Sequence, residues 1–292
     1  MKIGVLTDSS AYLTAEQCQK YQIKVMPIPL IWGEKTYRDM VDISVSEFYQ
    51  KLKTSTVLPT TSQPSAGELK AYIDDYVENG YTDVFVISIS SGLSSFYNAL
   101  SSYAKTETRL HVHAFDSKIT CAGLGQMVIL AARLVQEGAK PQEIEANLEN
   151  LRQTTDVRFM VDNLQYLRRT GRLSNASSFV GGLLKIKPIL GMDVQEKGEI
   201  SAIAKERQNK RAYDHIKRDF SRLIRDKSYP IQVTIFDAMN PQAKKEWHDD
   251  FAKSFPNVKI LESIIGPVVG VHVGQGTMAI IWSRDLDDYF KS

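Results

Sequence analysis

The sequence predicts a two-domain α/β protein, with an N-terminal, mostly parallel α/β/α sheet followed by a C-terminal α+β domain. Three observations lead to this prediction. Apolar, strand-like runs alternate with helical patterns over the first half of the chain, which is typical of a parallel sheet covered by helices on both faces. Three of those runs end in Asp-Ser or Ser-Ser pairs. Beyond a polar amphipathic segment at 141–153, the pattern changes to paired strands and scattered helices. We therefore expect domains at 1–153 and 154–292, with 141–153 as a linking helix.

The elements of the first half follow from apolar periodicity. The run at 25–32 contains Pro27 and Pro29, which is typical of an edge or irregular strand. Gly138 ends a long apolar helix, as glycine commonly does. The expected strands lie at 3–7, 25–32, 83–90 and 110–115, and the expected helices at 45–53, 66–79, 95–105 and 120–136.

The second half combines a hairpin with further strands and helices. Lys197-Gly198 separates two apolar runs and predicts a tight hairpin turn. A glycine-containing apolar helix is expected at 176–184. The expected strands lie at 157–161, 188–193, 199–205, 231–238, 258–263, 269–272 and 278–282, and the other helices at 164–169, 209–226 and 242–255.

Composition narrows the class of protein. The chain has 292 residues, 43% of them hydrophobic and 24% charged, which is ordinary for a globular protein with a sizeable core. It contains no apolar run long enough to span a membrane and no signal-peptide pattern at its start. Cys18 and Cys121 fall in helical patterns and are expected to be reduced and buried. A cytoplasmic location is the prediction.

Two hydroxyl-rich loops precede helices and form the strongest candidate for a binding site. The first runs over 58–65, where Ser65 is the expected helix N-cap and Glu68 its capping-box partner. The second runs over 88–95 and includes Ser94. Helix N-termini bind anions, and neutral hydroxyls suit a small acidic head group that is held without a tight salt bridge.

Other candidate groups lie in the second half. His272 precedes Gly274 and Gly276, whose backbone N–H groups we expect to be free for a ligand. Arg172 follows a short helix, and guanidinium groups recognise carboxylate and phosphate. His111 and His113 share one strand face without a third metal ligand nearby, so a polar edge is the prediction there.

Several function classes lack support. The chain has no Walker A loop, no dinucleotide-binding glycine pattern and no zinc motif, so we expect neither a cofactor nor a metal. The net charge of +2 argues neither for nor against nucleic-acid binding on its own, but such binding requires a stronger basic excess and base-stacking aromatic residues than the sequence offers. The basic segment 205–227 is expected to be a solvated helix, with a docking face for an acidic partner protein as the alternative.

A serine hydrolase or acyltransferase using Ser94 and His272 is the rival interpretation. Gly92-Leu93-Ser94-Ser95-Phe96 resembles the nucleophile elbow G-x-S-x-G, but Phe96 occupies the second glycine position. That substitution disfavours the strained turn on which a nucleophilic serine depends.

Taken in order, eight segments resemble the DegV family of bacterial fatty-acid-binding proteins. The match covers roughly residues 3–282, and its segments are Thr7-Asp8-Ser9-Ser10, Pro59-Thr60-Thr61-Ser62-Gln63-Pro64-Ser65, Ile89-Ser90-Ser91-Gly92-Leu93-Ser94, Asp116-Ser117, Tyr166-Leu167-Arg168-Arg169-Thr170-Gly171-Arg172-Leu173-Ser174, Lys187-Pro188-Ile189-Leu190, Lys205-Glu206-Arg207 and Gly270-Val271-His272-Val273-Gly274-Gln275-Gly276.

The resemblance implies a carrier that is not itself a catalyst. It would bury a long-chain fatty acid in or beside the second domain and present it to a partner fatty acid kinase, which makes acyl phosphate for phospholipid synthesis. By this resemblance Thr61, Ser62, Ser94 and His272 would bind the carboxylate. Arg207, His272 and Arg172 would lie at the mouth where the phosphoryl group arrives. A transient contact with a membrane is compatible with this role.

The chain departs from the family at Ser95 and Phe96, where relatives commonly have Gly-Thr. We therefore expect a phenylalanine ring beside the head-group site.

Overall fold

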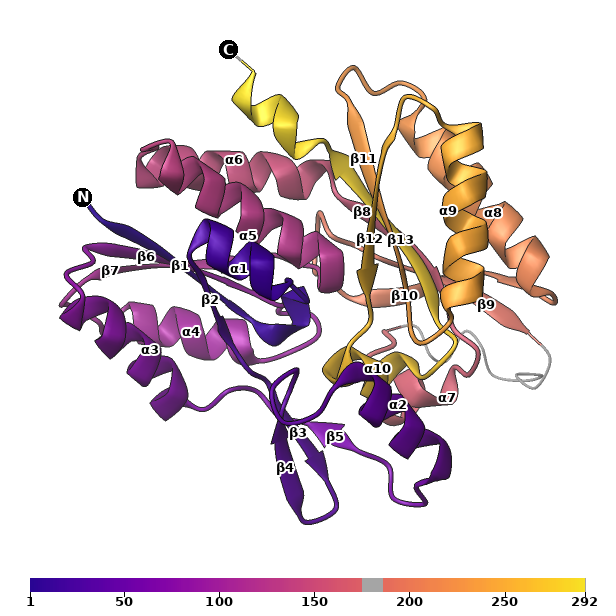
Figure 1. The fold of residues 1–292 in the computed structure, drawn as a ribbon, viewed down its shortest axis with the longest axis horizontal. Coiled ribbons are helices and arrows are strands. Elements are labelled where there is room, and N and C mark those ends of the chain that lie inside the picture. Colours follow the sequence, from indigo (N-terminus) through magenta and orange to yellow (C-terminus); the bar gives the residue numbers. More distant parts are fainter. Residues whose placement is uncertain (175–185, 292) are drawn as a thin grey trace.

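The computed structural model describes residues 1–174 and 186–291. Two α/β bodies lie side by side, and a small third sheet projects below them (Figure 1). The predicted helix at 176–184 lies outside the described residues. The first body holds a parallel sheet in the order β2-β1-β6-β7. Its strands are β1 (Ile3–Asp8), β2 (Ile23–Met26), β6 (Asp83–Ser88) and β7 (His111–Asp116).

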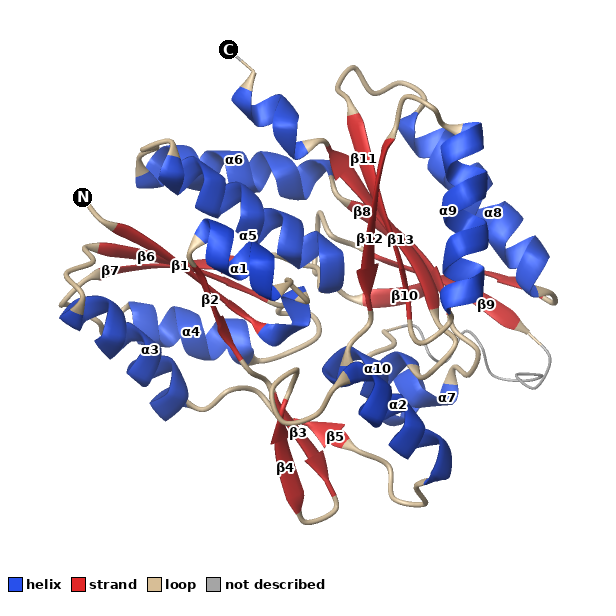
Figure 2. Ribbon diagram, viewed as in Figure 1, coloured by secondary structure: helices blue, strands red, loops and turns tan. Residues whose placement is uncertain are grey.

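Alternation along these strands places helices on both faces of the sheet, as predicted (Figure 2). Leu6, Val84 and Val86 pack into one hydrophobic cluster with α3 and α4. Val5 and Phe85 face the opposite cluster, which contains α5. The helices are α1 (Ala15–Tyr21), α3 (Ala66–Glu78), α4 (Phe96–Ala104) and α5 (Cys121–Gln136).

The second body is a six-stranded mixed sheet in the order β10-β9-β8-β13-β11-β12. The predicted hairpin is confirmed, since β9 and β10 are antiparallel neighbours and Gly198 in their connection has φ +67°. Its strands are β8 (Asp156–Met160), β9 (Lys187–Met192), β10 (Ile200–Glu206), β11 (Ile231–Asp237), β12 (Lys259–Ile264) and β13 (Met278–Arg284), and its helices are α7 (Gln165–Arg169), α8 (Asn209–Ile224), α9 (Pro241–Ser254) and α10 (Pro267–Val273).

The two sheets share a hydrophobic layer. The helices α8 and α9 cover one face of the second sheet through Phe220, Trp247 and Phe251. Phe236 and Ile281 on the opposite face belong to the same cluster as the apolar side chains of α5. The helix α6 (Pro141–Thr154) corresponds to the expected linking helix and buries its apolar residues within this layer. The domain boundary at 153–154 stays a prediction.

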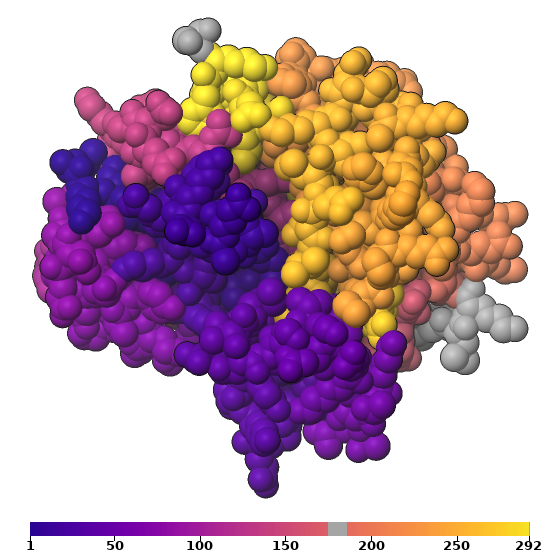
Figure 3. Space-filling model, viewed as in Figure 1, coloured from indigo at the N-terminus to yellow at the C-terminus, as the bar shows by residue number. Residues whose placement is uncertain are grey.

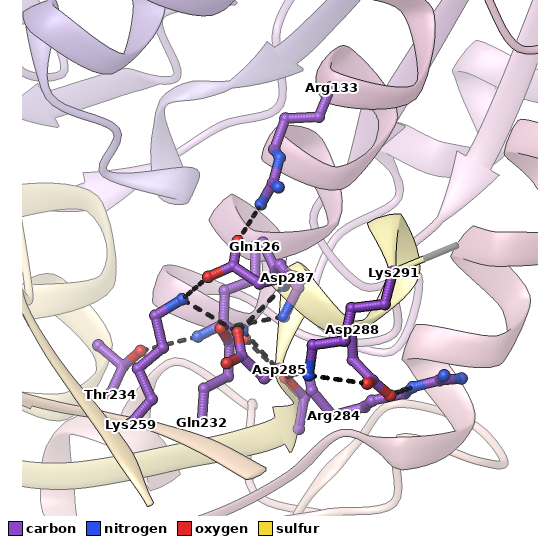
Figure 4. Close-up of polar contacts among 12 residues, drawn as sticks. Gln126, Arg133, Gln232, Thr234, Lys259, Arg284, Asp285, Asp287, Asp288 and Lys291 are labelled. Atoms are coloured by element: carbon purple, nitrogen blue, oxygen red, sulfur yellow. Dashed lines mark hydrogen bonds and ion pairs between the residues drawn. The ribbon is translucent and has the colours of Figure 1, made fainter. Parts of the chain in front are cut away.

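Polar contacts also join α5 to the second sheet (Figure 4). Gln126 of α5 is buried, and its Nε2 donates to Thr234 Oγ1 of β11 over 2.7 Å. Arg133, further along α5, pairs with Asp287 of the C-terminal segment at 2.8 Å. Lys259 of β12 pairs with Asp285 and with the same Asp287. These contacts fix the relative position of the two sheets along α5.

The small sheet was not predicted. The expected strand at 25–32 is divided at Pro27 into β2, which joins the first sheet, and β3 (Pro29–Trp32), which joins the small one. Proline lacks the N–H that a continuous ladder needs. The small sheet has the order β4-β3-β5, with β4 (Lys35–Arg38) and β5 (Thr60–Thr61), and α2 (Val45–Thr54) lies between these two strands in sequence.

The expected strand at 269–272 is wrong, because this segment is part of the helix α10. Its valines favour a strand locally. Pro267 in the first turn is compatible with a helix start, and Gly274, with φ +76°, ends the helix. Buried Asp39 accepts a hydrogen bond from the N–H of Val268 over 3.2 Å. Tertiary contacts therefore override the local preference.

Among the described helices, none is long and apolar enough to cross a membrane.

Candidate functional site

A cavity of about 100 Å³ lies where the loops of the first sheet, the strand β5 and the helix α10 meet. It brings together five residues predicted from sequence, which are Thr61, Ser62, Ser94, Arg172 and His272. They come from both halves of the chain, so the site forms only when the two sheets pack together.

Thr61 is positioned by a two-residue strand. It pairs with Leu30 of β3, and the next N–H, that of Ser62, donates to the carbonyl of Pro29 over 3.1 Å. Side chains alternate along a strand. Thr60 is accordingly exposed, whereas Thr61 is half-buried and lines the cavity.

His272 lies opposite Thr61, and its Nε2 is 3.0 Å from Thr61 Oγ1. Burial lowers the pKa of His272 to about 3, with further lowering by the positive charges of Arg172 and Arg169. The imidazole is therefore neutral at physiological pH. Its Nδ1 is buried and has no hydrogen-bond partner among the described residues. A buried polar atom without a partner is rare in folded proteins and points to a missing ligand or water.

The Thr61–His272 pair has one hydrogen to offer a ligand. If the threonine hydroxyl donates to Nε2, the neutral ring carries its proton on Nδ1, which is then a free donor. If Nε2–H donates to Oγ1, the threonine hydroxyl keeps its own hydrogen for the ligand. Either arrangement supplies a donor to a carboxylate.

Two carboxylates at strand ends hold the second hydroxyl loop in place. Asp8 at the end of β1 accepts from the N–H of Ile89 over 2.7 Å. Asp116 at the end of β7 accepts from the N–H and the hydroxyl of Ser91, at 3.1 and 2.5 Å. Burial raises the pKa of Asp8. The Asp-Ser strand ends noted in the sequence therefore support the loop, and neither aspartate lines the cavity.

Ser94 and Arg172 complete the head of the cavity. Ser94 Oγ accepts from the N–H of Phe96 over 3.2 Å, which leaves the hydroxyl hydrogen for another partner. Arg172 Nε donates to the carbonyl of Leu93 over 3.3 Å, and its Nη1 donates to the carbonyl of Thr170. The cavity thus contains a fixed positive charge, whereas the hydroxyl loops alone suggested neutral donors.

Three more polar residues line the cavity, of which Gln63 and Ser95 lie in the two predicted loops and Thr120 lies outside them. Ser95 Oγ donates to Gln63 Oε1 over 2.6 Å and so joins the two hydroxyl loops. Thr120 Oγ1 is buried. Within the described part of the chain it interacts with the thiol of the neighbouring Cys121 and has no other hydrogen-bond partner. The hydroxyl-rich spacing of 58–65 and 88–95 could have indicated Gln63 and Ser95. Thr120 has no comparable pattern around it.

The expected anion site at the start of α3 is wrong. Ser65 and Glu68 do form the predicted capping box, but each satisfies the other's backbone N–H. The carboxylate of Glu68 thereby occupies the helix end, and Ser65 does not line the cavity.

Two other expectations also fail. The backbone N–H groups of Gly274 and Gly276 bind the carbonyls of Gly270 and Ala238, so they are not free. Phe96 is 1% exposed and packs into the core under α3 and α4, and it does not line the cavity.

Arg207 is not brought to this cavity. It is exposed, follows directly after β10, and is absent from the cavity lining.

The described residues do not assemble a serine-hydrolase triad. His272 Nε2 is bound to Thr61, and Ser94 Oγ is bound to a backbone N–H. No carboxylate in the described part of the chain contacts His272 Nδ1, where a triad needs its orienting acid.

A second, wholly apolar cavity of about 40 Å³ adjoins the first. Thr120, Ile200, Val269 and Val273 line both cavities. Beyond these residues, the second cavity is bounded by side chains of the shared hydrophobic layer, including Phe159, Met192, Phe236 and Ile281. We call the two together the inner cavities. They form a polar head and an apolar continuation, the arrangement typical of a site for an amphipathic ligand.

The chain thus combines two packed α/β bodies with a cavity between them that is polar at one end and apolar at the other. A model of the DegV family, described as uncharacterised proteins, matches residues 2–285, so the chain belongs to the DegV family. It is 35% identical to Protein DegV of Bacillus subtilis, over 97% of this chain and 99% of that protein.

Solved structures agree with this assignment. The fold is similar to that of the Bacillus subtilis DegV, described as a fatty acid binding protein, with TM-score 0.89, 33% identity, and coverage of 98% of this chain and 100% of that one. A DegV family protein from Thermus thermophilus, described for its fatty acid binding, also gives TM-score 0.89 at 28% identity, with the same coverage.

Proposed function

We propose that this chain binds one long-chain fatty acid, with the carboxylate in the cavity formed by Thr61, Ser62, Ser94 and His272. The acyl chain would run along α10, past Val269 and Val273, into the apolar cavity. One observation carries this proposal. The cavity lined by His272, whose Nδ1 has no partner among the described residues, adjoins the wholly apolar cavity.

The energetics of such a ligand favour this arrangement. Burying about fifteen methylenes gains roughly 12 kcal/mol gross, at ~0.8 kcal/mol each. A membrane offers a similar gain for the acyl chain. Binding of the carboxylate therefore decides whether the protein can compete with a membrane for the fatty acid. A carboxylate that leaves water must find donors. Arg172, the Thr61–His272 pair and the free hydrogen of Ser94 Oγ supply them.

The relatives support the same ligand class. Two solved DegV structures that match this chain over 98% of its length are described as fatty-acid-binding proteins. The inner cavities are small in this closed arrangement, so uptake of a long chain requires their surroundings to move apart.

The protein would then serve as a carrier that presents its fatty acid to a fatty acid kinase. Positive groups stabilise transferring phosphoryl oxygens. Arg172 supplies a positive group at the head of the cavity, beside a neutral His272. Arg207, exposed after β10, would contact the partner from the surface.

Extraction of the purified protein under denaturing conditions, followed by mass spectrometry, tests the ligand. We expect about one long-chain fatty acid per chain. The absence of a stoichiometric lipid, together with no uptake from added fatty acid, would contradict the proposal. Transfer of phosphate from ATP to the bound lipid, measured with and without a bacterial fatty acid kinase, tests the carrier role separately.

A further inference from the structure

A cleft of about 710 Å³ lies apart from the inner cavities. It opens between the indigo N-terminal part and the orange C-terminal part of the molecule (Figure 3). We call it the outer cleft. Its lining is mainly apolar and comes from α1, α5, β12 and neighbouring loops, including Leu13, Ala122, Gly125, Ile129, Leu261 and Ile264.

The outer cleft and the inner apolar cavity lie along the same elements. Ala122 and Ile264 line the cleft, whereas their chain neighbours Cys121 and Ile265 line the inner cavity. On β11, Thr234 faces the cleft, and Phe236, two positions on, faces the inner cavity. Little more than one layer of side chains therefore separates the two spaces.

Tyr12 belongs to that layer. It is 7% exposed and lines the outer cleft. Its ring lies directly on Gly266, where an added Cβ would come within 2.2 Å of Cε1. Its hydroxyl accepts a hydrogen bond from the N–H of Val269 over 3.0 Å, and Val269 lines both inner cavities. The phenol thus extends from the cleft to the inner lining and is held at both ends.

We propose that Tyr12 sets the longest acyl chain that the protein accepts, because its side chain lines the outer cleft and accepts a hydrogen bond from the backbone of Val269, which lines the inner apolar cavity. The inner cavities are small, whereas the outer cleft that Tyr12 lines is larger and mainly apolar. Shortening this side chain joins the two spaces, and the methyl end of a longer fatty acid then occupies the outer cleft. This inference rests on the proposed function.

A competition experiment tests the proposal. The delipidated full-length protein is mixed with equal amounts of saturated fatty acids of increasing length, and the bound lipids are extracted and quantified by mass spectrometry. We expect Tyr12→Ala to shift the bound population toward longer chains, by about fourfold in affinity for each methylene that gains burial. Tyr12→Phe keeps the ring and removes only the hydroxyl, so its distribution should match that of the unchanged chain.

The rate at which Cys18 is alkylated gives an independent measure of whether the outer cleft is occupied. Cys18 lines the cleft, whereas Cys121 is buried. Alkylation of Cys18 should slow severalfold when Tyr12→Ala is loaded with a very long fatty acid, and should not slow in Tyr12→Phe. If Tyr12→Ala folds poorly, Tyr12→Leu supports the same comparison with a smaller cavity. Folded variants with an unchanged chain-length distribution would overturn this inference alone. Failure of every variant and of the unchanged chain to retain any fatty acid would overturn the proposed function and this inference with it.

Discussion

Thr61 and His272 lie 211 positions apart in the sequence, yet Thr61 Oγ1 and His272 Nε2 are 3.0 Å apart in the fold. Thr61 belongs to a two-residue strand of the small sheet, and His272 to the short helix α10 of the second body. Their contact joins the two halves of the chain at the head of the cavity.

Thr61→Val should weaken fatty-acid binding, because valine keeps the shape of the side chain and removes its hydroxyl. A hydrogen bond to a charged group contributes about 1.5–3 kcal/mol, so we expect Kd to rise roughly 10- to 100-fold. Titration with a fluorescent fatty acid measures this change. Thr60→Val alters the exposed neighbour on the same strand and serves as the matched control. Equal affinities in the two variants would remove Thr61 from the head-group site.

Arg172→Met should weaken binding of fatty acids but not of the corresponding fatty alcohols, because it removes the fixed positive charge in the cavity. Arg172→Lys should restore only part of the affinity, since an ammonium cannot reproduce the planar guanidinium. Arg168→Met changes an exposed arginine on α7 and is the control. Loss of alcohol and acid binding by the same factor would show that Arg172 acts through the packing of its loop and not through charge.

The lowered pKa of His272 predicts a specific pH dependence of stability. Between its ordinary value of 6.5 and about 3, the unfolded chain binds a proton that the folded chain does not. The contribution of this group is therefore complete above pH 6.5 and is lost as the pH falls toward 3. Relative to His272→Gln, the unchanged protein should lose up to about 1.4 kcal/mol of unfolding free energy per pH unit in this range.

Denaturant titrations of both proteins between pH 7 and pH 4 measure this difference. His111→Gln, at an exposed position on β7, is the control for a generic loss of histidine. A pH-independent difference between the unchanged protein and His272→Gln would contradict the buried, neutral state of His272.

Asp39 should show the opposite trend. Burial raises its pKa to about 7, while Ser9 and the N–H of Val268 donate to its carboxylate. Between 3.8 and 7 the folded chain binds more protons than the unfolded one, so the contribution of Asp39 is complete below that window and is lost as the pH rises through 7. Asp39→Asn removes this pH-dependent contribution to stability.

We therefore expect the stability of Asp39→Asn, relative to the unchanged protein, to improve from pH 5 to about pH 7 and to level off by pH 8. Thermal unfolding across this range measures the change, and Asp42→Asn, at an exposed aspartate of the same loop, is the comparison. The hydrogen bonds that the side chain and backbone N–H of Arg38 donate lower the pKa of Asp42 to about 2. A relative stability of Asp39→Asn that falls with rising pH would contradict the assignment.

Local patterns predicted much of the fold. The capping box of Ser65 and Glu68 and the β9–β10 hairpin at Gly198 depend on neighbouring residues, and both were correct. The helix α10 was predicted as a strand because its valines favour one locally. Its actual start depends on Pro267 and on Asp39, which is more than 200 positions away in the chain. The small sheet depends on pairing between segments separated by α2, which no local pattern reveals.

The site was predicted in part for the same reason. Thr61, Ser62 and Ser94 lie in loops with several hydroxyls, so their composition indicated a polar site. Thr120 contributes to the cavity only because the start of α5 faces both bodies. No sequence pattern indicated that Tyr12 lies near the site, since its position depends on Gly266 and Val269 of the other body.

A crystal structure of the protein with a long-chain fatty acid would locate the bound ligand. We expect electron density with the carboxylate within hydrogen-bonding distance of Thr61 or His272, and with the acyl chain in the apolar cavity beyond Val269 and Val273. A fatty acid bound elsewhere, or one whose carboxylate points to solvent away from Thr61, would contradict this expectation.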